Sequence, residues 1–228
     1  MGSENGLSKE RARAEVFRLL SACLCEPEKD AFLQEGLFDH LGRALGRVRP
    51  GAEAPAREMK AALSAETEEA LRVEYARLFV GPNELPAPPY GSVYLEKGRT
   101  VMGRSTVHVV AFYRSEGVHV DDEAAELPDH IAVELEFVHY LITRELAELE
   151  AGNREAAARL GRKQEEFLQR YVLPWAPRWC ADVASHTESA YYSSLACLLQ
   201  GLMERPDCLL PAPGRANERT HKEARPFV

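Results

Sequence analysis

The sequence predicts an all-α protein, a single-domain bundle of about nine or ten helices. Apolar residues recur at intervals of three and four in several separate segments, and prolines and glycines fall between those segments. No alternating strand series and no βαβ rhythm occurs. With 228 residues, 45% of them apolar and 28% charged, the chain is long enough to bury one well-packed core.

Three helices are expected in the first 63 residues of the chain. The first begins near Ser8 and ends at Pro27, because proline cannot continue a helix. The second spans 32–48 and carries one apolar stripe, and a short third helix covers 59–63.

The next helix is opened by glutamates at 66, 68 and 69, which favour the positive end of the helix dipole, and it ends at Gly81-Pro82. Its apolar residues fall at i, i+4, i+7 and i+8, namely Leu71, Tyr75, Leu78 and Phe79. A short extended piece is expected at 93–95. Ser105 is then expected to cap a helix that ends at Gly117.

The longest helix is expected to start at Pro128-Asp129 and to form the centre of the core. Its apolar stripe has steps of 4, 3, 4, 4 and 3 residues: Ile131, Leu135, Val138, Ile142, Leu146 and Leu149. Two helices follow, one through 160–171 and one over 187–204, with a bend forced between them by Pro174 and Pro177. Residues 1–205 should form the helical domain, and the proline-rich residues 206–228 a loosely ordered tail.

The segment 81–94, GPNELPAPPYGSVY, is called the strap here. Four of its fourteen residues are proline, so the segment is stiff and loses little entropy when it is ordered. Its rings offer flat apolar surface: Pro86, Pro88, Pro89, Tyr90 and Tyr94. The strap can either pack down on the bundle as a lid or leave one wall of a groove exposed.

Few residues indicate catalysis. No glycine loop follows a strand, and the five cysteines show no ligand-like spacing. Asp129 can cap a helix, with His130 tied to Glu134, or the two residues can form a polar recognition corner for a ligand. A helical metalloenzyme is an alternative from another class, using His130, Glu134, Glu136 and His139. Glu136 nevertheless lies about 140° around the helix from Ile131, which favours a solvated face, and no metal is expected.

The net charge of −8, from 28 basic and 36 acidic side chains, argues against nucleic-acid binding and is compatible with a cationic partner. No apolar run is long enough to span a bilayer, and the N-terminus lacks the features of a signal peptide. We therefore expect a cytoplasmic protein without stable membrane insertion.

Two blocks of residues carry a family resemblance. One is Glu74-Tyr75-x-x-Leu78-Phe79-x-Gly81-Pro82 followed by Pro86-Ala87-Pro88-Pro89-Tyr90-x-Ser92-Val93-Tyr94. The other is Tyr113-x-x-x-Gly117 followed by Pro128-Asp129-His130-x-x-x-Glu134-Leu135-Glu136-Phe137. Together they resemble the TorD/DmsD family of redox-enzyme maturation chaperones over roughly residues 8–204.

The resemblance implies an all-helical cytoplasmic chaperone with neither catalytic activity nor a cofactor. Its partner would be the catalytic subunit of a molybdopterin oxidoreductase, held back from export through its twin-arginine leader peptide. The family's signature positions, thought to border the peptide site, map to Pro86, Pro88, Pro89, Tyr90, Ser92, Tyr94, Asp129, His130 and Glu134. An acidic rim facing the arginines is expected from Asp121, Asp122, Glu123 and Glu126. A related branch, NarJ, grips a subunit that is not exported, and this alternative stays open, as does the choice between monomer and homodimer.

Overall fold

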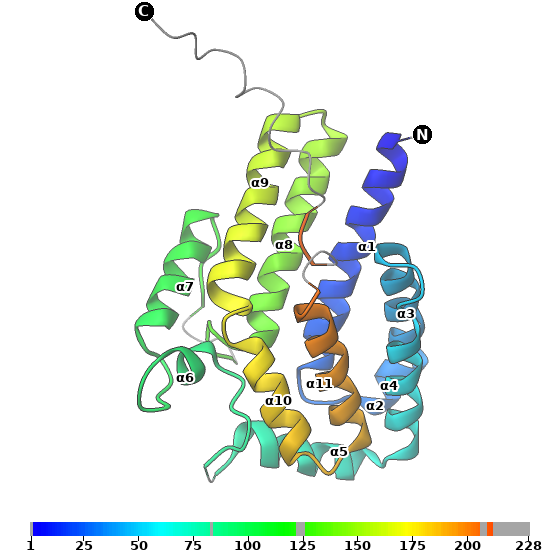
Figure 1. Ribbon diagram of the computed structural model, residues 1–228, viewed down its shortest axis with the longest axis vertical. Coiled ribbons are helices and arrows are strands. Elements are labelled where there is room, and N and C mark those ends of the chain that lie inside the picture. Colours follow the sequence, from blue (N-terminus) through cyan, green and yellow to red (C-terminus); the bar gives the residue numbers. More distant parts are fainter. Residues whose placement is uncertain (1, 83, 122–125, 206–208, 212–228) are drawn as a thin grey trace, which may run out of the picture.

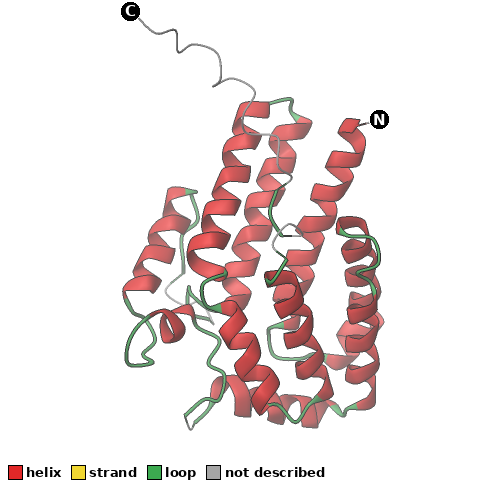
Figure 2. Cartoon of the chain, viewed as in Figure 1, coloured by secondary structure: helices red, strands yellow, loops and turns green. Residues whose placement is uncertain are grey.

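The computed structural model describes residues 2–82, 84–121, 126–205 and 209–211, and this part of the chain is an all-α fold of helices joined by loops, as predicted (Figures 1 and 2). It contains eleven α-helices, nine of them with at least seven residues. They are α1 Gly2–Cys23, α2 Lys29–Gln34, α3 Leu37–Val48, α4 Ala54–Ala65, α5 Glu68–Tyr75, α6 Gly91–Leu95, α7 Arg104–Ser115, α8 Ile131–Glu150, α9 Arg154–Phe167, α10 Ala176–His186 and α11 Ala190–Met203. π-helical turns extend α5 (η1, Ala76–Val80) and α9 (η2, Leu168–Val172).

Helix α8 lies at the centre of the bundle. It packs between α1 and α9, while α1 also packs on α3, α3 on α4, α4 on α11 and α11 on α10 (Figure 1). The predicted stripe of α8 is confirmed over its first four residues, because Ile131, Leu135, Val138 and Ile142 are each at most 1% exposed. Its last two residues, Leu146 and Leu149, are only half-buried. The short α6 packs against α7 on one flank of the bundle (Figure 1).

Four sequence-based expectations about local structure are wrong. The stretch 32–48 is two helices, because the chain turns at Gly36 with φ of 63°. Residues 93–95 belong to α6 and are not extended. Ser105 does not cap α7; its N–H and hydroxyl both donate to Glu96. With 20 residues, α8 is shorter than α1, which has 22.

The beginning of the predicted tail packs on the bundle where the structure describes it. Leu209 is 2% exposed, and its carbonyl accepts a hydrogen bond of 2.7 Å from the buried Arg13 of α1. Pro211 lies against Gly161 of α9. Among the described residues, no helix combines the length and the apolarity needed to cross a bilayer.

Candidate peptide-binding groove

The strap is attached through its backbone to the residues that precede α8. The Ile131 N–H donates to the Pro89 carbonyl, and the Gly91 N–H donates to the Asp129 carbonyl, both at 2.9 Å. These bonds form an antiparallel bridge between Tyr90 and His130. The rigid middle of the strap thereby becomes part of the wall of the bundle.

Asp129 stabilises the strap rather than its own helix. Its Oδ2 accepts a hydrogen bond of 2.8 Å from the Ser92 N–H, in the first turn of α6, and its side chain is 1% exposed. His130 is the residue that caps α8, because its Nδ1 accepts from the Ala132 N–H at 3.1 Å. The expected capping role therefore belongs to the histidine.

Two tryptophans of the α9–α10 region hold the strap from the other side. The Trp175 Nε1–H donates to Glu134 at 3.2 Å, and the Trp175 ring stacks on Tyr94. The Trp179 Nε1–H donates to the carbonyl of Ala87 at 3.0 Å. Sequence reasoning missed both tryptophans, since they lie more than eighty residues from the strap and carry no spacing signal.

Burial makes the environment of Glu134 unusual. The pKa of this carboxyl is raised well above its ordinary value, mainly because burial disfavours the charged form and also because Asp129 lies nearby. Burial likewise lowers the pKa of His130 to about 4. Burial therefore favours the neutral form of both groups, which suits a packed interior more than a charged recognition corner.

The structure thus shows the first of the two arrangements considered for the strap, namely packing down on the bundle. Only Pro86 and Tyr90, among the sequence-predicted peptide-binding residues, are half-buried. The side chains of the others are buried: Pro88, Pro89, Ser92, Tyr94, Asp129, His130 and Glu134.

A groove of about 490 Å³ lies beside this attachment, and Pro128 is one of the residues that line it. It is formed by the end of α1, the segment after α7 and the first three turns of α8. Its apolar lining comprises Val118, Val120, Ala132, Val133, Phe137 and Tyr140. Carboxylates of Asp121, Glu126 and Glu136 line it as well.

This groove brings together part of the predicted acidic rim. Asp121 and Glu126 line it, whereas Asp122 and Glu123 lie outside the described residues. Glu136 was assigned to a solvated face; it is indeed exposed, but that face is the groove. The missed signal is its position between Val133 and Tyr140, one turn from each.

Glu126 connects the groove to the strap. Its carboxylate accepts a hydrogen bond from the Tyr90 hydroxyl and lies 3.8 Å from the His130 Nε2. Burial raises the pKa of Glu126, and this increase is only partly offset by the hydrogen bond. An incoming cation would favour the charged form of Glu126.

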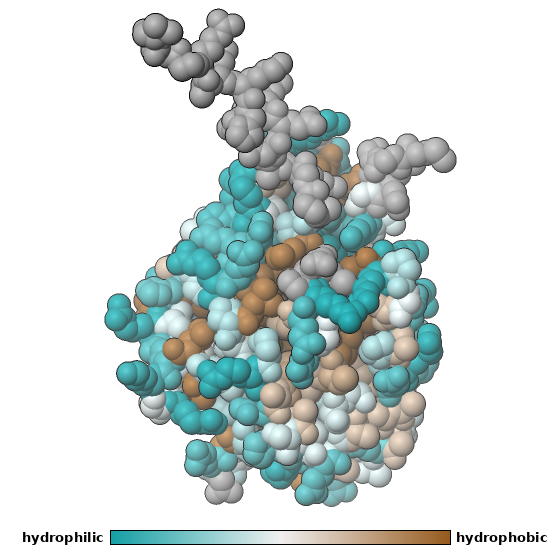
Figure 3. All heavy atoms as spheres, in the orientation of Figure 1, coloured by the Kyte–Doolittle hydropathy of each residue, from teal (hydrophilic) through white to brown (hydrophobic). Residues whose placement is uncertain are grey.

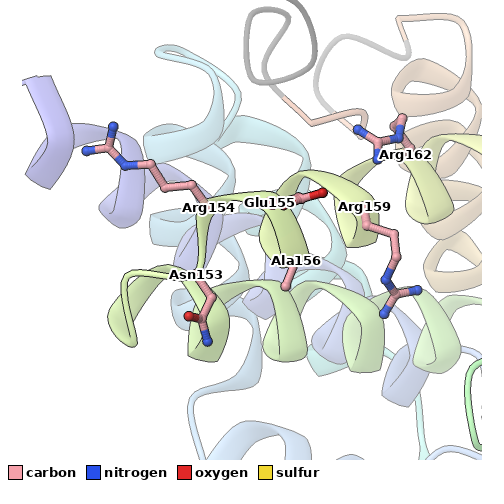
Figure 4. A pocket seen from close by; sticks show the side chains of 6 residues that line it. All are labelled: Asn153, Arg154, Glu155, Ala156, Arg159 and Arg162. Atoms are coloured by element: carbon pink, nitrogen blue, oxygen red, sulfur yellow. The ribbon is translucent and has the colours of Figure 1, made fainter.

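A second hollow, of about 510 Å³, lies along the first turns of α9 (Figure 4). Its arginines do not converge: Figure 4 shows Arg154, Arg159 and Arg162 pointing in different directions. Arg159 is already paired with Glu116 at 3.0 Å. This hollow offers neither an apolar floor nor a focused charge.

Three of the four residues of the metalloenzyme hypothesis have other contacts. His130 caps α8, Glu134 accepts from Trp175, and the His139 Nδ1 lies 2.9 Å from the Ala14 carbonyl. Within the described ranges, no group of three His, Cys, Asp or Glu side chains is placed to hold a metal ion.

Comparison with known proteins identifies the family. Residues 46–181, which include the strap and the whole of α8, match the family model of the nitrate reductase delta subunit. The chain belongs to this family. The resemblance to the TorD/DmsD redox-enzyme maturation chaperones is confirmed by relatives of the same kind.

Among curated members, the chain is 30% identical over 134 residues to the Tat proofreading chaperone DmsD of Salmonella typhi, covering 58% of each protein. It is 31% identical over 129 residues to the chaperone protein TorD of Vibrio vulnificus, covering 57% of this chain and 59% of the relative. These matches thus span less than two thirds of either relative.

A longer match, 27% identical over 210 residues, links the chain to a perchlorate reductase assembly chaperone protein of Dechloromonas aromatica, covering 87% of this chain and 89% of the relative. The fold resembles the crystal structure of a proposed redox enzyme maturation protein from Archaeoglobus fulgidus. That comparison has a TM-score of 0.55 and 25% identity, and it covers 84% of this chain and 93% of the other. Members of the nitrate reductase delta subunit family thus share both sequence and architecture with this chain.

Proposed function

We propose that this protein is a cytoplasmic chaperone that binds the twin-arginine leader peptide of a molybdopterin oxidoreductase catalytic subunit. It would hold that subunit back from export until the cofactor has been inserted. Membership of the nitrate reductase delta subunit family supports a chaperone role. The names of its DmsD relatives, Tat proofreading chaperones, support a role in export.

The observation that carries this proposal is the composition of the groove. Its floor is apolar, and Asp121, Glu126 and Glu136 contribute negative charge to its lining. A twin-arginine leader combines a cationic head with an apolar run, so each half of such a peptide finds its counterpart in one site.

Both halves are needed on energetic grounds. Burying about 400 Å² of apolar leader surface would contribute about 10 kcal/mol at 25 cal/mol per Å². Association and ordering cost about 4–15 kcal/mol, so apolar contact alone leaves weak binding or none. The carboxylates must supply the remainder, and they also provide the preference for arginine.

The predicted signature residues take a different part in this proposal. Asp129, His130 and Glu134 are buried, and they position the strap and the start of α8 without touching the peptide. Tyr90 acts through Glu126, to which its hydroxyl donates. These residues would hold the wall of the groove in shape, while Asp121, Glu126 and Glu136 contact the arginines.

Calorimetry with a synthetic leader tests the proposal. We expect micromolar or tighter affinity, with Glu136→Lys weakening it about tenfold, which corresponds to about 1.4 kcal/mol. Glu58→Lys on α4 is the matched control, because Glu58 is exposed, lies outside the groove and is changed by the same charge. Equal affinities for the two variants, or an affinity that does not fall with added salt, would remove the groove from the proposal.

A second candidate function is assembly of a molybdoenzyme subunit that is not exported. Two observations favour it: the nitrate reductase delta subunit family model and the perchlorate reductase assembly chaperone relative. The two candidate functions differ in whether the client subunit must carry a leader peptide. Co-purification with a client subunit whose leader has been removed would support this second function, and loss of the complex would support leader binding.

A further inference from the structure

The flank formed by the end of α6, the following loop and the start of α7, residues 95–107, is called the α7 lobe here. It carries four of the six large apolar side chains that are exposed among the described residues: Leu95, Val101, Met102 and Val107. Figure 3 shows apolar surface interrupted by hydrophilic side chains on the side of the molecule where α6 and α7 lie in Figure 1. Such clustering is typical of an interaction surface.

The α7 lobe is also basic, in a protein whose net charge is −8. Lys97, Arg99 and Arg104 are exposed, and none of them forms an ion pair in the part of the chain that the structure describes. Its acidic residue, Glu96, is used internally, since it accepts hydrogen bonds from Ser105. With Glu96 counted against Lys97, Arg99 and Arg104, the lobe presents a net charge of +2 beside apolar side chains.

The loop holds this surface in an unusual backbone conformation. Arg99 and Met102 adopt φ of 50° and 60°, in the left-handed region that side chains other than glycine rarely enter. Met102 remains 58% exposed in that conformation. Strain of this kind is found preferentially at binding sites.

The α7 lobe and the groove are complementary. The lobe combines apolar side chains with three cations, and the groove combines an apolar floor with three carboxylates. They lie at opposite ends of α7, whose 12 residues separate them by about 18 Å at 1.5 Å per residue. Tyr113 and the segment 118–121, at the far end, line the groove.

We propose that two copies of this chain pair with their α7 helices antiparallel, so that the α7 lobe of each occupies the groove of the other. Such a two-fold arrangement is self-complementary and closed, because each copy supplies one lobe and one groove. Val107, 65% exposed and in the first turn of α7, would be covered near the two-fold axis. The pairing closes both grooves and so prevents a leader peptide from binding there. This competition rests on the proposed function, whereas the pairing itself does not.

A second copy fits the α7 lobe better than an anionic membrane does. The net charge of −8 opposes approach of the whole protein to a negative surface. The groove of another copy instead offers local carboxylates and an apolar floor.

Sedimentation velocity over about 1–200 µM protein at low salt tests the pairing. We expect a reversible dimer that weakens as salt is added. The lobe variant, Lys97→Glu with Arg99→Glu, should weaken the dimer at least tenfold, and the groove variant, Glu136→Lys, should do the same. The charge-matched control, Arg47→Glu with Arg49→Glu at the end of α3, should not weaken it. Mixing the lobe variant with the groove variant should restore dimers, because the reversed lobe then meets a reversed groove.

A wild-type protein that stays monomeric throughout, or variants that fail to restore one another on mixing, would overturn the proposal. Binding to anionic vesicles by a protein that does not self-associate would overturn it as well. A separate experiment tests competition with a leader. A twin-arginine peptide should dissociate the dimer and should bind the monomeric lobe variant more tightly than it binds wild type. If dimers form as described but neither protein binds the leader, the proposed function fails and the pairing stands.

Discussion

Asp129→Ala tests whether the buried signature residues act by attaching the strap. The substitution removes the acceptor for the Ser92 N–H, which lies 2.8 Å from Oδ2 in a site that is 1% exposed. It leaves the backbone bonds of Gly91 and Ile131 in place. The strap should therefore loosen at α6 while the bundle keeps its helices.

The magnitude follows from one buried, charge-assisted hydrogen bond. Such a bond contributes about 1.5–3 kcal/mol, and an unpaired N–H would remain in its place. Two effects act in the other direction: Asp129 Oδ1 has no partner among the described atoms, and the Asp129 charge, which disfavours the charged form of Glu134, is removed. We expect a net loss of about 2 kcal/mol, which lowers the melting temperature by about 4–8 °C in a chain of this size.

Urea unfolding followed by far-ultraviolet circular dichroism measures this loss. Asp129→Asn, which keeps an acceptor oxygen, should lose less than about 1 kcal/mol. Asp39→Ala is the control, because Asp39 is an exposed aspartate that pairs with Lys60 on the surface, and its midpoint should stay close to wild type. An Asp129→Ala midpoint equal to that of wild type would refute the attachment role.

Three further predictions concern buried polar groups. Since burial lowers the pKa of His130 to about 4, the free energy of unfolding should fall by up to about 3 kcal/mol as the pH drops from about 6.5 to 4. In His130→Asn, which can still cap α8, the unfolding midpoint should change less over the same pH range. Since the pKa of Glu134 is raised, the stability that its neutral form contributes at low pH is lost as the pH rises. Glu134→Gln should therefore be more stable than wild type at pH 8 and equal to it at low pH. A lower unfolding midpoint for the variant at pH 8 would contradict this. Glu74 is buried beside the α10–α11 turn, and burial alone would raise its pKa; hydrogen bonds from Arg77, the Glu188 N–H and Thr187 outweigh burial and lower the pKa to about 2. Glu74→Gln should therefore cost about 2 kcal/mol of stability at pH 7, measured by thermal melts. An unchanged melting temperature would count against this role of Glu74.

The helices could be predicted because their apolar periodicity is local. The stripe of α8 from Ile131 to Ile142 is buried where its spacing places it. A row beside that stripe is buried as well, namely His130, Glu134, Phe137 and Leu141. The errors arise where a single residue changes the backbone, as Gly36 does, or where a distant side chain replaces a local cap, as Glu96 does for Ser105.

The site was predictable only in part. The acidic character of the rim is present in the local sequence, and Asp121 and Glu126 do line the groove. The state of the strap depends on Trp175 and Trp179, which meet it only in the folded chain, and no spacing rule connects them. Glu136 was set aside because helix geometry shows which face is exposed but not whether a neighbouring segment turns that face into a groove.

Photo-crosslinking with a twin-arginine leader tests the central claim most directly. The peptide carries a photoreactive residue next to its arginine pair, and the crosslinked positions are read by mass spectrometry. The account predicts crosslinks to 118–121 and to the face of α8 that holds Val133, Glu136 and Tyr140, all of which Glu136→Lys should reduce. Crosslinks concentrated on the first turns of α9, or an equal yield from that variant, would contradict it.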